Sequence, residues 1–193
     1  MDRKDFLKKS IGMCSFLALG PVAPCCAEAG EGKTPGTPCE KKQDFAQIWV
    51  KRMFDILDSQ LNDATRKKLM ETMGETCYRG SLGDAANETP KPLEIDALVA
   101  GMRRYGGEEM ARREGNTIYF QYIKNPDGLR VADGFCLCPL VESGPPGLSG
   151  TYCQCSVGYV RAMFARLLGK PVQVELTESL KRGGKACRFT VHV

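Results

Sequence analysis

Apolar positions in the first half of the chain recur at the spacing of amphipathic helices. From about Gln43, one helix is expected to bury a stripe of Phe45, Ile48, Trp49, Met53, Ile56 and Leu57. A second is expected behind Asn62 or Asp63 as its cap, with Leu69, Met70, Met73 and Cys77 inward. A third, opened by Pro92, is expected to bury Ile95, Leu98, Val99 and Met102. The pattern therefore predicts a helical N-terminal half.

The C-terminal half changes to the alternation of strands. The segment TIYFQYI (117–123) is β-branched and aromatic, NPDG (125–128) is typical of a turn, and 129–140 is expected to return as the partner strand. A helix is expected from Ser156 to Leu168, ended by Gly169. PVQVELTESL and KACRFTVHV then alternate around the turn KRGGK. The predicted fold class is α+β, a mostly antiparallel four-stranded sheet with helices packed against it.

The N-terminal residues have the pattern of an export signal rather than of a folded element. A charged start (MDRKDFLKKS), a short apolar run and a small-residue exit predict a signal peptide over residues 1–27. Residues 28–42, rich in Gly, Pro, Thr and Lys, are predicted to be a linker. With 193 residues, 42% of them hydrophobic, the remainder is expected to form a single α+β domain over 43–193.

The export route stays open at this point. Arg3 and Lys4 resemble the twin-arginine (Tat) motif, Sec export is an alternative, and lipidation of Cys25 or Cys26 is a third. Each predicts a periplasmic or otherwise extracytoplasmic protein, lipid-anchored in the third case. The apolar run is far shorter than the roughly 20 residues of a membrane span, so no membrane span is expected.

Charge excludes one class of partner. The net charge of the chain is +4, and its basic residues are scattered among acidic ones. A nucleic-acid-binding protein gathers basic residues on one surface, so no nucleic acid is expected as a partner. The oligomeric state is not indicated by the sequence.

Two Cys-x-Cys pairs carry the most specific chemistry. Cys136 and Cys138 fall on the expected strand, and Cys153 and Cys155 fall where the last helix begins. Four converging thiolates are typical of zinc or an iron–sulfur cluster. Two crosswise disulfides, favoured by an oxidising compartment, and buried or reactive free thiols are the alternatives. Cys187 alternates with Phe189 and Val191 and is expected in the core.

The ending GYVRAMFARLLGKPVQVELTESLKRGGKACRFTV, residues 158–191, resembles the C-terminal part of the 4-vinyl reductase domain, a relative of the Bet3-like subunits of the TRAPP complex. The resemblance implies a small-molecule-binding domain with an apolar cavity between sheet and helices. We therefore expect a ligand pocket for a small apolar ligand, lined by Tyr122, Val160, Phe164 and Phe189.

The residues needed for common catalytic machinery are scarce. His192 is the only histidine, and it is out of phase with the inward residues of its strand. The favoured function is thus an exported small-molecule-binding or metal-binding domain. The alternative is a cysteine-dependent hydrolase, since the chain also resembles the L-2-amino-thiazoline-4-carboxylic acid hydrolase group of compact cysteine-containing domains. In that case Cys153 or Cys155 is the candidate nucleophile.

Overall fold

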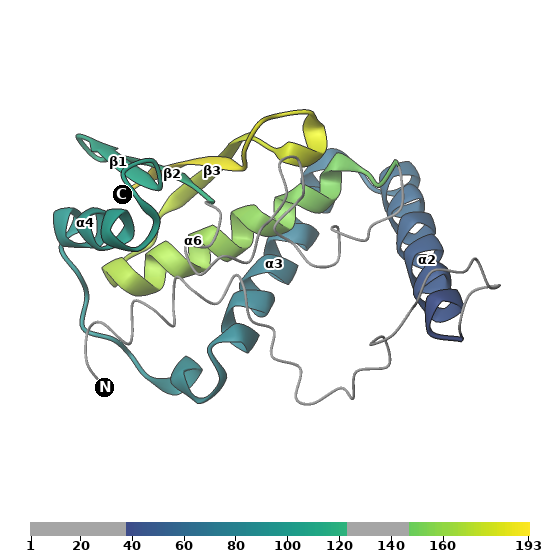
Figure 1. Cartoon of the computed structure of the whole chain (residues 1–193), viewed down its shortest axis with the longest axis horizontal. Coiled ribbons are helices and arrows are strands. Elements are labelled where there is room, and N and C mark those ends of the chain that lie inside the picture. Colours follow the sequence, from purple (N-terminus) through teal and green to yellow (C-terminus); the bar gives the residue numbers. More distant parts are fainter. Residues whose placement is uncertain (1–37, 123–146) are drawn as a thin grey trace, which may run out of the picture.

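The computed structural model describes residues 38–122 and 147–193, and within them the chain is an α+β protein, as the sequence predicts (Figure 1). Its helices are α2 (Pro38–Gln60), α3 (Asp63–Ser81), α4 (Ile95–Gly106) and α6 (Gln154–Leu168). Its strands are β1 (Ala111–Glu114), β2 (Thr117–Gln121), β3 (Gln173–Glu178) and β4 (Arg188–His192). Short 3-10 helices, η1 (Gly83–Asn87), η2 (Gly150–Cys153) and η3 (Leu180–Arg182), join them.

The sheet is antiparallel and has the strand order β1-β2-β4-β3. Strand β1 was not predicted, because its sequence ARRE is polar and carries none of the β-branched or aromatic signal of a strand. It pairs with β2 through a short turn at residues 115 and 116. The strand expected over 129–140 lies outside the described residues. The partners of β2 in the described part of the chain are β1 and β4.

The main core lies between this sheet and the helices α4 and α6. Helix α6 runs beneath the sheet, and α3 lies on the other side of α6 (Figure 1). The apolar residues that helical spacing places on one face of α6 are all buried: Val160, Met163, Phe164, Leu167 and Leu168. Gly169 ends the helix in the left-handed conformation, with φ of +67°. Ile118, Phe164 and Phe189 have at most 1% of their surface exposed. The helix and strand patterns in this half therefore located the core correctly.

Helices α3 and α6 cross at two glycines, so closely that their backbones touch. A Cβ atom placed on Gly74 would lie 1.8 Å from the carbonyl oxygen of Cys155, and one on Gly158 would lie 1.8 Å from that of Glu71. The buried face of α3 is consequently Met70, Gly74 and Tyr78. The expected stripe was wrong in three of its four members: Leu69, Met73 and Cys77 are exposed. A glycine at the centre of a contact gives no hydrophobic signal, which is why the sequence missed this face.

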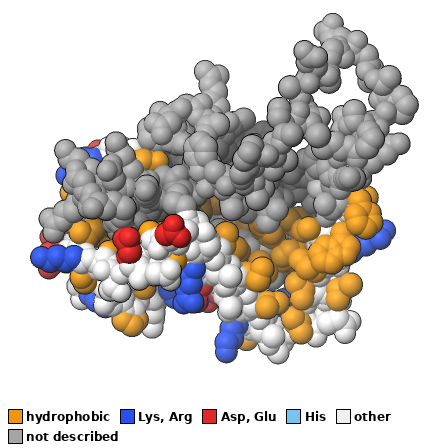
Figure 2. All heavy atoms as spheres, turned by 90° about the horizontal axis from the view of Figure 1, so that it is seen from below, with side chains coloured by type: hydrophobic (Ala, Val, Ile, Leu, Met, Phe, Trp, Pro, Cys, Tyr) orange, Lys and Arg blue, Asp and Glu red, His pale blue; other side chains and the backbone are white. Residues whose placement is uncertain are grey.

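Helix α2 packs through a small second cluster and leaves much of its apolar surface exposed. It begins at Pro38, ahead of the start expected near Gln43, and proline is favourable in the first turn of a helix. Phe54 is buried with Met70, Leu148 and Tyr152. The predicted burial of the rest of the stripe was wrong for Phe45, Ile48, Trp49 and Ile56, which are 48–67% exposed. Hydrophobic side chains gather at the α2 end of the face seen in Figure 2.

Within residues 38–122 and 147–193, no helix combines the length and the apolar character that a membrane span requires.

Candidate functional site

The start of α6 is built by a chain of local hydrogen bonds. The chain turns at Gly147, where φ is +78°, and the Ser149 side chain then caps η2 by accepting a hydrogen bond from the Thr151 N–H at 3.1 Å. The Thr151 hydroxyl donates to Asp58 Oδ1 of α2 at 2.8 Å. These contacts fix η2, and Cys153, its last residue, becomes the N-cap of α6.

Cys153 belongs to a buried cluster of three polar side chains. Its Sγ atom lies 3.1 Å from the Oγ atom of Ser179, which follows β3. Ser179 is only 2% exposed, and Cys187, directly before β4, is 7% exposed. Cys153 and Cys187 are both free thiols. The prediction that Cys187 faces the core is confirmed, and the structure brings it into the neighbourhood of Cys153.

The surroundings of Cys187 favour its protonated form. Burial raises the pKa of the Cys187 thiol, a hydrogen bond from the Leu180 N–H opposes this, and the proximity of the ionisable Cys153 and Glu178 side chains raises that pKa further. The pKa of Glu178 itself is lowered, first by the hydrogen bond from the Lys185 N–H at 2.6 Å. Glu178 therefore carries a charge and holds the turn between β3 and β4.

The structure does not bring Cys153 and Cys155 to the same neighbours. Cys155 is half-buried and packs against the cluster of Phe54, Met70, Leu148 and Tyr152, on the α2 side of α6. Cys136 and Cys138 lie outside the described residues. Within residues 38–122 and 147–193, no group of three or more His, Cys, Asp or Glu side chains is arranged to hold a metal ion.

A small pocket opens beside the cluster. It has a volume of about 340 Å³ and is lined by Leu176, Thr177, Glu178, Ser179, Arg182, Gly183 and Gly184. Ser179 thus borders the pocket and also contacts the Cys153 thiol. Arg182 donates a hydrogen bond to the Gly150 carbonyl at 3.2 Å, which links η3 to η2.

The four residues expected to line an apolar pocket come together in the main core. Val160, Phe164 and Phe189 are buried, and Tyr122 packs against the same cluster while half-buried. The Tyr122 and Phe189 rings meet edge to face with centroids 5.0 Å apart. A ligand cavity among these residues stays a prediction.

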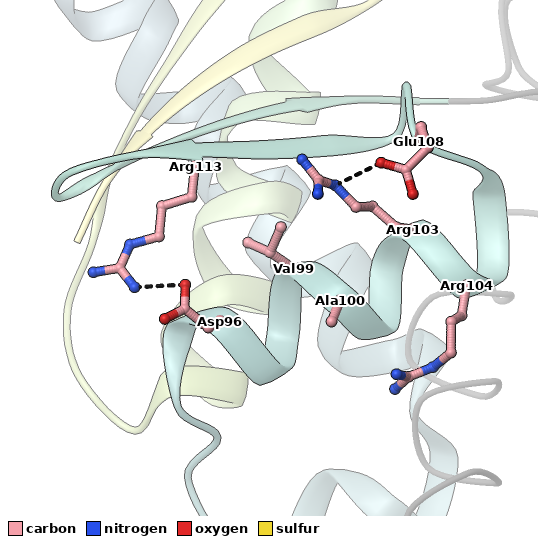
Figure 3. Close-up of a pocket in the computed structure, with 7 residues that line it drawn as sticks. All are labelled: Asp96, Val99, Ala100, Arg103, Arg104, Glu108 and Arg113. Atoms are coloured by element: carbon pink, nitrogen blue, oxygen red, sulfur yellow. Dashed lines mark hydrogen bonds and ion pairs between the residues drawn. The ribbon is translucent and has the colours of Figure 1, made fainter.

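A second, larger pocket lies between α4 and β1 and is polar (Figure 3). Its volume is about 570 Å³, and Val99 and Ala100 lie between its charged groups. Arg113 pairs with Asp96 at 2.7 Å, Arg103 lies 3.4 Å from Glu108, and Arg104 extends away from both pairs. Two of the three arginines are therefore neutralised by carboxylates, and the pocket has little excess charge with which to select an anion.

The histidine does not take part in either pocket. His192 is exposed on β4, as predicted, and its Nε2 atom lies 4.0 Å from Glu175 Oε1. In the described part of the chain, the polar group next to the Cys153 thiol is a serine hydroxyl rather than an imidazole or a carboxylate. The contact of the Cys153 thiol is therefore to a group that does not act as a general base near neutral pH.

Sequence reasoning missed Ser179 and the charged pairs of the larger pocket. Ser179 is a polar residue at the end of a strand, and only its 2% exposure shows that it faces inward. The pairing of Glu178 with Arg188 brings Ser179 and Cys187 to the same end of the hairpin, and strand alternation alone does not predict this register because it shifts between Leu176 and Glu178.

The fold and site define an α+β domain with two buried thiols, Cys153 at the start of α6 and Cys187 directly before β4. A family model described as a family of unknown function, DUF6144, matches residues 33–193, so the chain belongs to this family. The family match names no 4-vinyl reductase domain, and that finer resemblance stays a prediction. No curated protein matches the chain.

The structure is similar to that of a trafficking protein particle complex subunit 3 from Naegleria fowleri, which was solved covalently bound to palmitic acid. The two share 11% sequence identity, and the match covers 79% of this chain and 95% of that one, with a TM-score of 0.44. A similarity at this level is too low to transfer a ligand or a function.

Proposed function

We propose that the chain is an exported binding protein whose cysteines bind a thiophilic metal, either zinc or an iron–sulfur cluster. The observation that carries the proposal is the Cys153 thiol, buried at the start of α6 beside Ser179 and near a second thiol, Cys187. The N-terminus of a helix favours the thiolate form that a metal needs. Metal binding requires no general base beside the thiol, and the neighbour of the Cys153 thiol is a serine hydroxyl rather than a base.

The proposed ligands are Cys136, Cys138, Cys153 and Cys155, and four thiolates satisfy the tetrahedral preference of zinc. Cys153 is the ligand that the described domain holds most firmly, since η2 and Ser179 fix it. Cys155 packs against the α2 cluster, so its side chain must rotate before it can bind the metal. Replacing Cys153 is therefore expected to reduce metal binding more than replacing Cys155.

A small apolar ligand is the second kind of binding partner that the sequence suggests. Two rings of its expected lining, Tyr122 and Phe189, pack edge to face with centroids 5.0 Å apart. The hydrolase alternative needs a base beside its thiol, and Ser179 does not supply one. A metal is thus the better supported partner.

Elemental analysis of the purified chain tests this function. We expect zinc or iron close to a fixed ratio in the wild-type protein, a strong loss in Cys153→Ser and in the double variant Cys136→Ser/Cys138→Ser, and retention in Cys77→Ser. Cys77 is an exposed cysteine on α3 and is the matched control. Wild-type protein that holds no more zinc or iron than Cys153→Ser would overturn the proposal.

Export is tested separately. The intact mass of the protein isolated from cells that naturally make it is expected to correspond to a chain that begins after Ala27. A mass that still includes residues 1–27 would contradict export by a cleaved signal.

A further inference from the structure

Cys153 and Cys187 contact two consecutive residues, Ser179 and Leu180. The Cys153 Sγ atom lies 3.1 Å from Ser179 Oγ. The Cys187 thiol accepts a hydrogen bond from the Leu180 N–H and lies near enough to Cys153 for the two groups to interact electrostatically. The last pair of the β3–β4 hairpin, Glu178 with Arg188, brings both segments to the same end of the sheet. The two thiols are thus close neighbours in space although 34 positions separate them in the sequence.

Burial alone does not explain the arrangement of these groups. A cysteine in an apolar core acts as a small hydrophobic residue, yet Cys153 contacts a hydroxyl that is itself 2% exposed. The Leu180 N–H is also directed to the Cys187 sulfur. Consecutive residues, Ser179 and Leu180, therefore supply one polar contact to each thiol.

The pocket of about 340 Å³ gives a small solute a route to this pair. Ser179 lines it, so the pocket reaches the residue that contacts Cys153 Sγ. Glu178 in its wall is engaged by Arg188 and by the Lys185 N–H, whereas Arg182 keeps a side chain at the rim with one contact to the Gly150 carbonyl. Arg182 therefore lines the pocket without a carboxylate partner among the described residues, which favours a disulfide that carries a carboxylate group.

We propose that Cys153 and Cys187 are a redox-active thiol pair that reacts with small organic disulfides at the Ser179 pocket. The thiolate of Cys153 attacks one sulfur of the disulfide, forms a mixed disulfide and releases the first small thiolate, which takes up a proton. The Cys187 thiolate then attacks Cys153 Sγ and releases the second. The two protein thiols together lose two electrons and two protons, and the small disulfide is reduced to two thiols.

Cys153 is assigned the first step because of its position. It is the N-cap residue of α6, and its Sγ atom contacts Ser179, which lines the pocket from which the disulfide approaches. Cys187 is the resolving residue, because its contact is to Leu180, which does not line that pocket, and it is reached through Cys153 once the mixed disulfide has formed. This chemistry goes beyond the proposed metal binding and does not depend on it.

Disulfide mapping of the wild-type chain tests the pair. The reduced protein, stripped of metal with a chelator, is incubated with oxidised glutathione, alkylated, digested with trypsin and analysed by mass spectrometry. Cleavage at Arg130, Arg161, Lys185 and Arg188 leaves Cys187 in the peptide 186–188 and Cys153 in the peptide 131–161. We expect these peptides to be linked, with fragmentation assigning the bond to Cys153.

Two serine variants in the same Cys-x-Cys motif give a matched comparison. Cys153→Ser is expected to lower the yield of the link to Cys187 at least about tenfold, and Cys155→Ser to leave it within about twofold of wild type. In Cys187→Ser, the reaction is expected to stop at the mixed disulfide between glutathione and Cys153. Linkage of Cys187 to another cysteine, or alkylation of Cys187 in wild-type protein after oxidation, would overturn the proposal.

The mapping needs no variant to fold, because its main result comes from the wild-type chain. It is also separable from the proposed function, since the protein is free of metal throughout. Wild-type protein that binds no metal but forms the Cys153–Cys187 link would contradict only the function proposed above. Wild-type protein that binds metal but does not form the link would contradict only the thiol pair.

Discussion

Helices α2 and α6 both contact α3, but by opposite means. At α6 the two backbones touch at Gly74 and Gly158. Half-buried ion pairs flank that contact, with Arg161 reaching Glu71 and Glu75 at 2.5 and 2.6 Å. Helix α2 instead rests on a cluster of four buried residues and keeps a broad apolar face exposed. The α3–α6 interface therefore depends on close backbone packing that leaves no room for a larger side chain at either glycine. The α2–α3 interface depends on a few buried side chains.

The difference bears on the thiol pair, because the start of α6 belongs to both interfaces. Tyr152 is in the α2 cluster, with its ring 5.2 Å from that of Phe54, and the next residue is Cys153. Cys155 packs on the same cluster, while its carbonyl oxygen touches the glycine contact with α3. A change in the position of α2 is thus expected to alter the surroundings of Cys153 more than it alters the sheet.

The largest effect is expected where the backbones touch. Gly158→Ala places a methyl group against the Glu71 carbonyl, so the helices must separate, and we expect a loss of at least about 3 kcal/mol in the free energy of unfolding. Gly80→Ala on α3 is the control, because no atom lies within 4 Å of its added Cβ. Chemical denaturation measures both. Equal effects of the two changes would refute tight packing at this crossing.

A smaller and more local effect is expected at α2. Phe54→Ala empties the centre of the α2 cluster, and we expect a loss of about 3 kcal/mol, the low end for a buried phenylalanine because the cluster is small. Amide exchange should rise in α2 and η2 before it rises in α4. Trp49→Ala removes a side chain that is 55% exposed and should change stability by less than about 0.5 kcal/mol. Uniform exchange along the whole chain in Phe54→Ala would contradict the separation of the two regions.

The sequence located most of the fold but little of the site, and the reasons are physical. Alternation and helical periodicity report burial of large apolar groups, so α6, β3 and β4 were found where Phe164, Phe189 and Val191 are buried. Gly74 is buried but has no apolar side chain, so periodicity does not reveal its contact. Trp49 is apolar but exposed, so periodicity wrongly predicts that it is buried. The partnership of Cys153, Ser179 and Cys187 depends on tertiary register, which one chain's periodicity does not encode.

High pH should weaken the α3–α6 side through Tyr78. Burial raises the pKa of Tyr78 from 10.0 to about 12, partly offset by the charge of Arg166, and its hydroxyl has no hydrogen-bond partner among the described residues. The unfolded chain loses this proton first, so stability is fully present below pH 10 and falls as pH rises toward about 12. The slope is at most about 1.4 kcal/mol per pH unit.

Tyr78→Phe is the matched variant for that pH dependence. It keeps the ring, which packs edge to face on Tyr159 with centroids 5.2 Å apart, and removes only the hydroxyl. Denaturant titrations between pH 9 and pH 12 should therefore show a flatter profile than wild type. An unchanged profile would mean that another group causes the alkaline loss.

The smallest effect is expected at the link between α2 and η2. Burial would raise the pKa of Asp58, but hydrogen bonds from Ser149 and Thr151 and the charge of Arg66 outweigh it and hold that pKa below 3.8. The ionised carboxylate therefore stabilises the fold above the pKa of an unfolded aspartate, and this contribution is lost as pH falls through the lower folded value. Acid should loosen α2 rather than the sheet.

Replacing the carboxylate checks this assignment. Asp58→Ala removes the acceptor of the 2.8 Å hydrogen bond from Thr151 and should lower the free energy of unfolding by about 0.5–1.5 kcal/mol at neutral pH. The difference from wild type should shrink as the pH falls below 3.8. Asp55→Ala, which removes an exposed ion pair with Lys51, is the control and should have a smaller effect. A constant difference at every pH would contradict the role of the Asp58 charge.

The strand order has a consequence for how the chain is made. The sheet runs β1-β2-β4-β3, so the strand that is synthesised last of the four lies inside the sheet, between β2 and β3. Until residues 188–192 leave the ribosome, β2 and β3 both lack the strand that lies between them in the described sheet. Unpaired edges invite pairing with other chains. A nascent chain that lacks this segment is thus more exposed to aggregation than the finished chain.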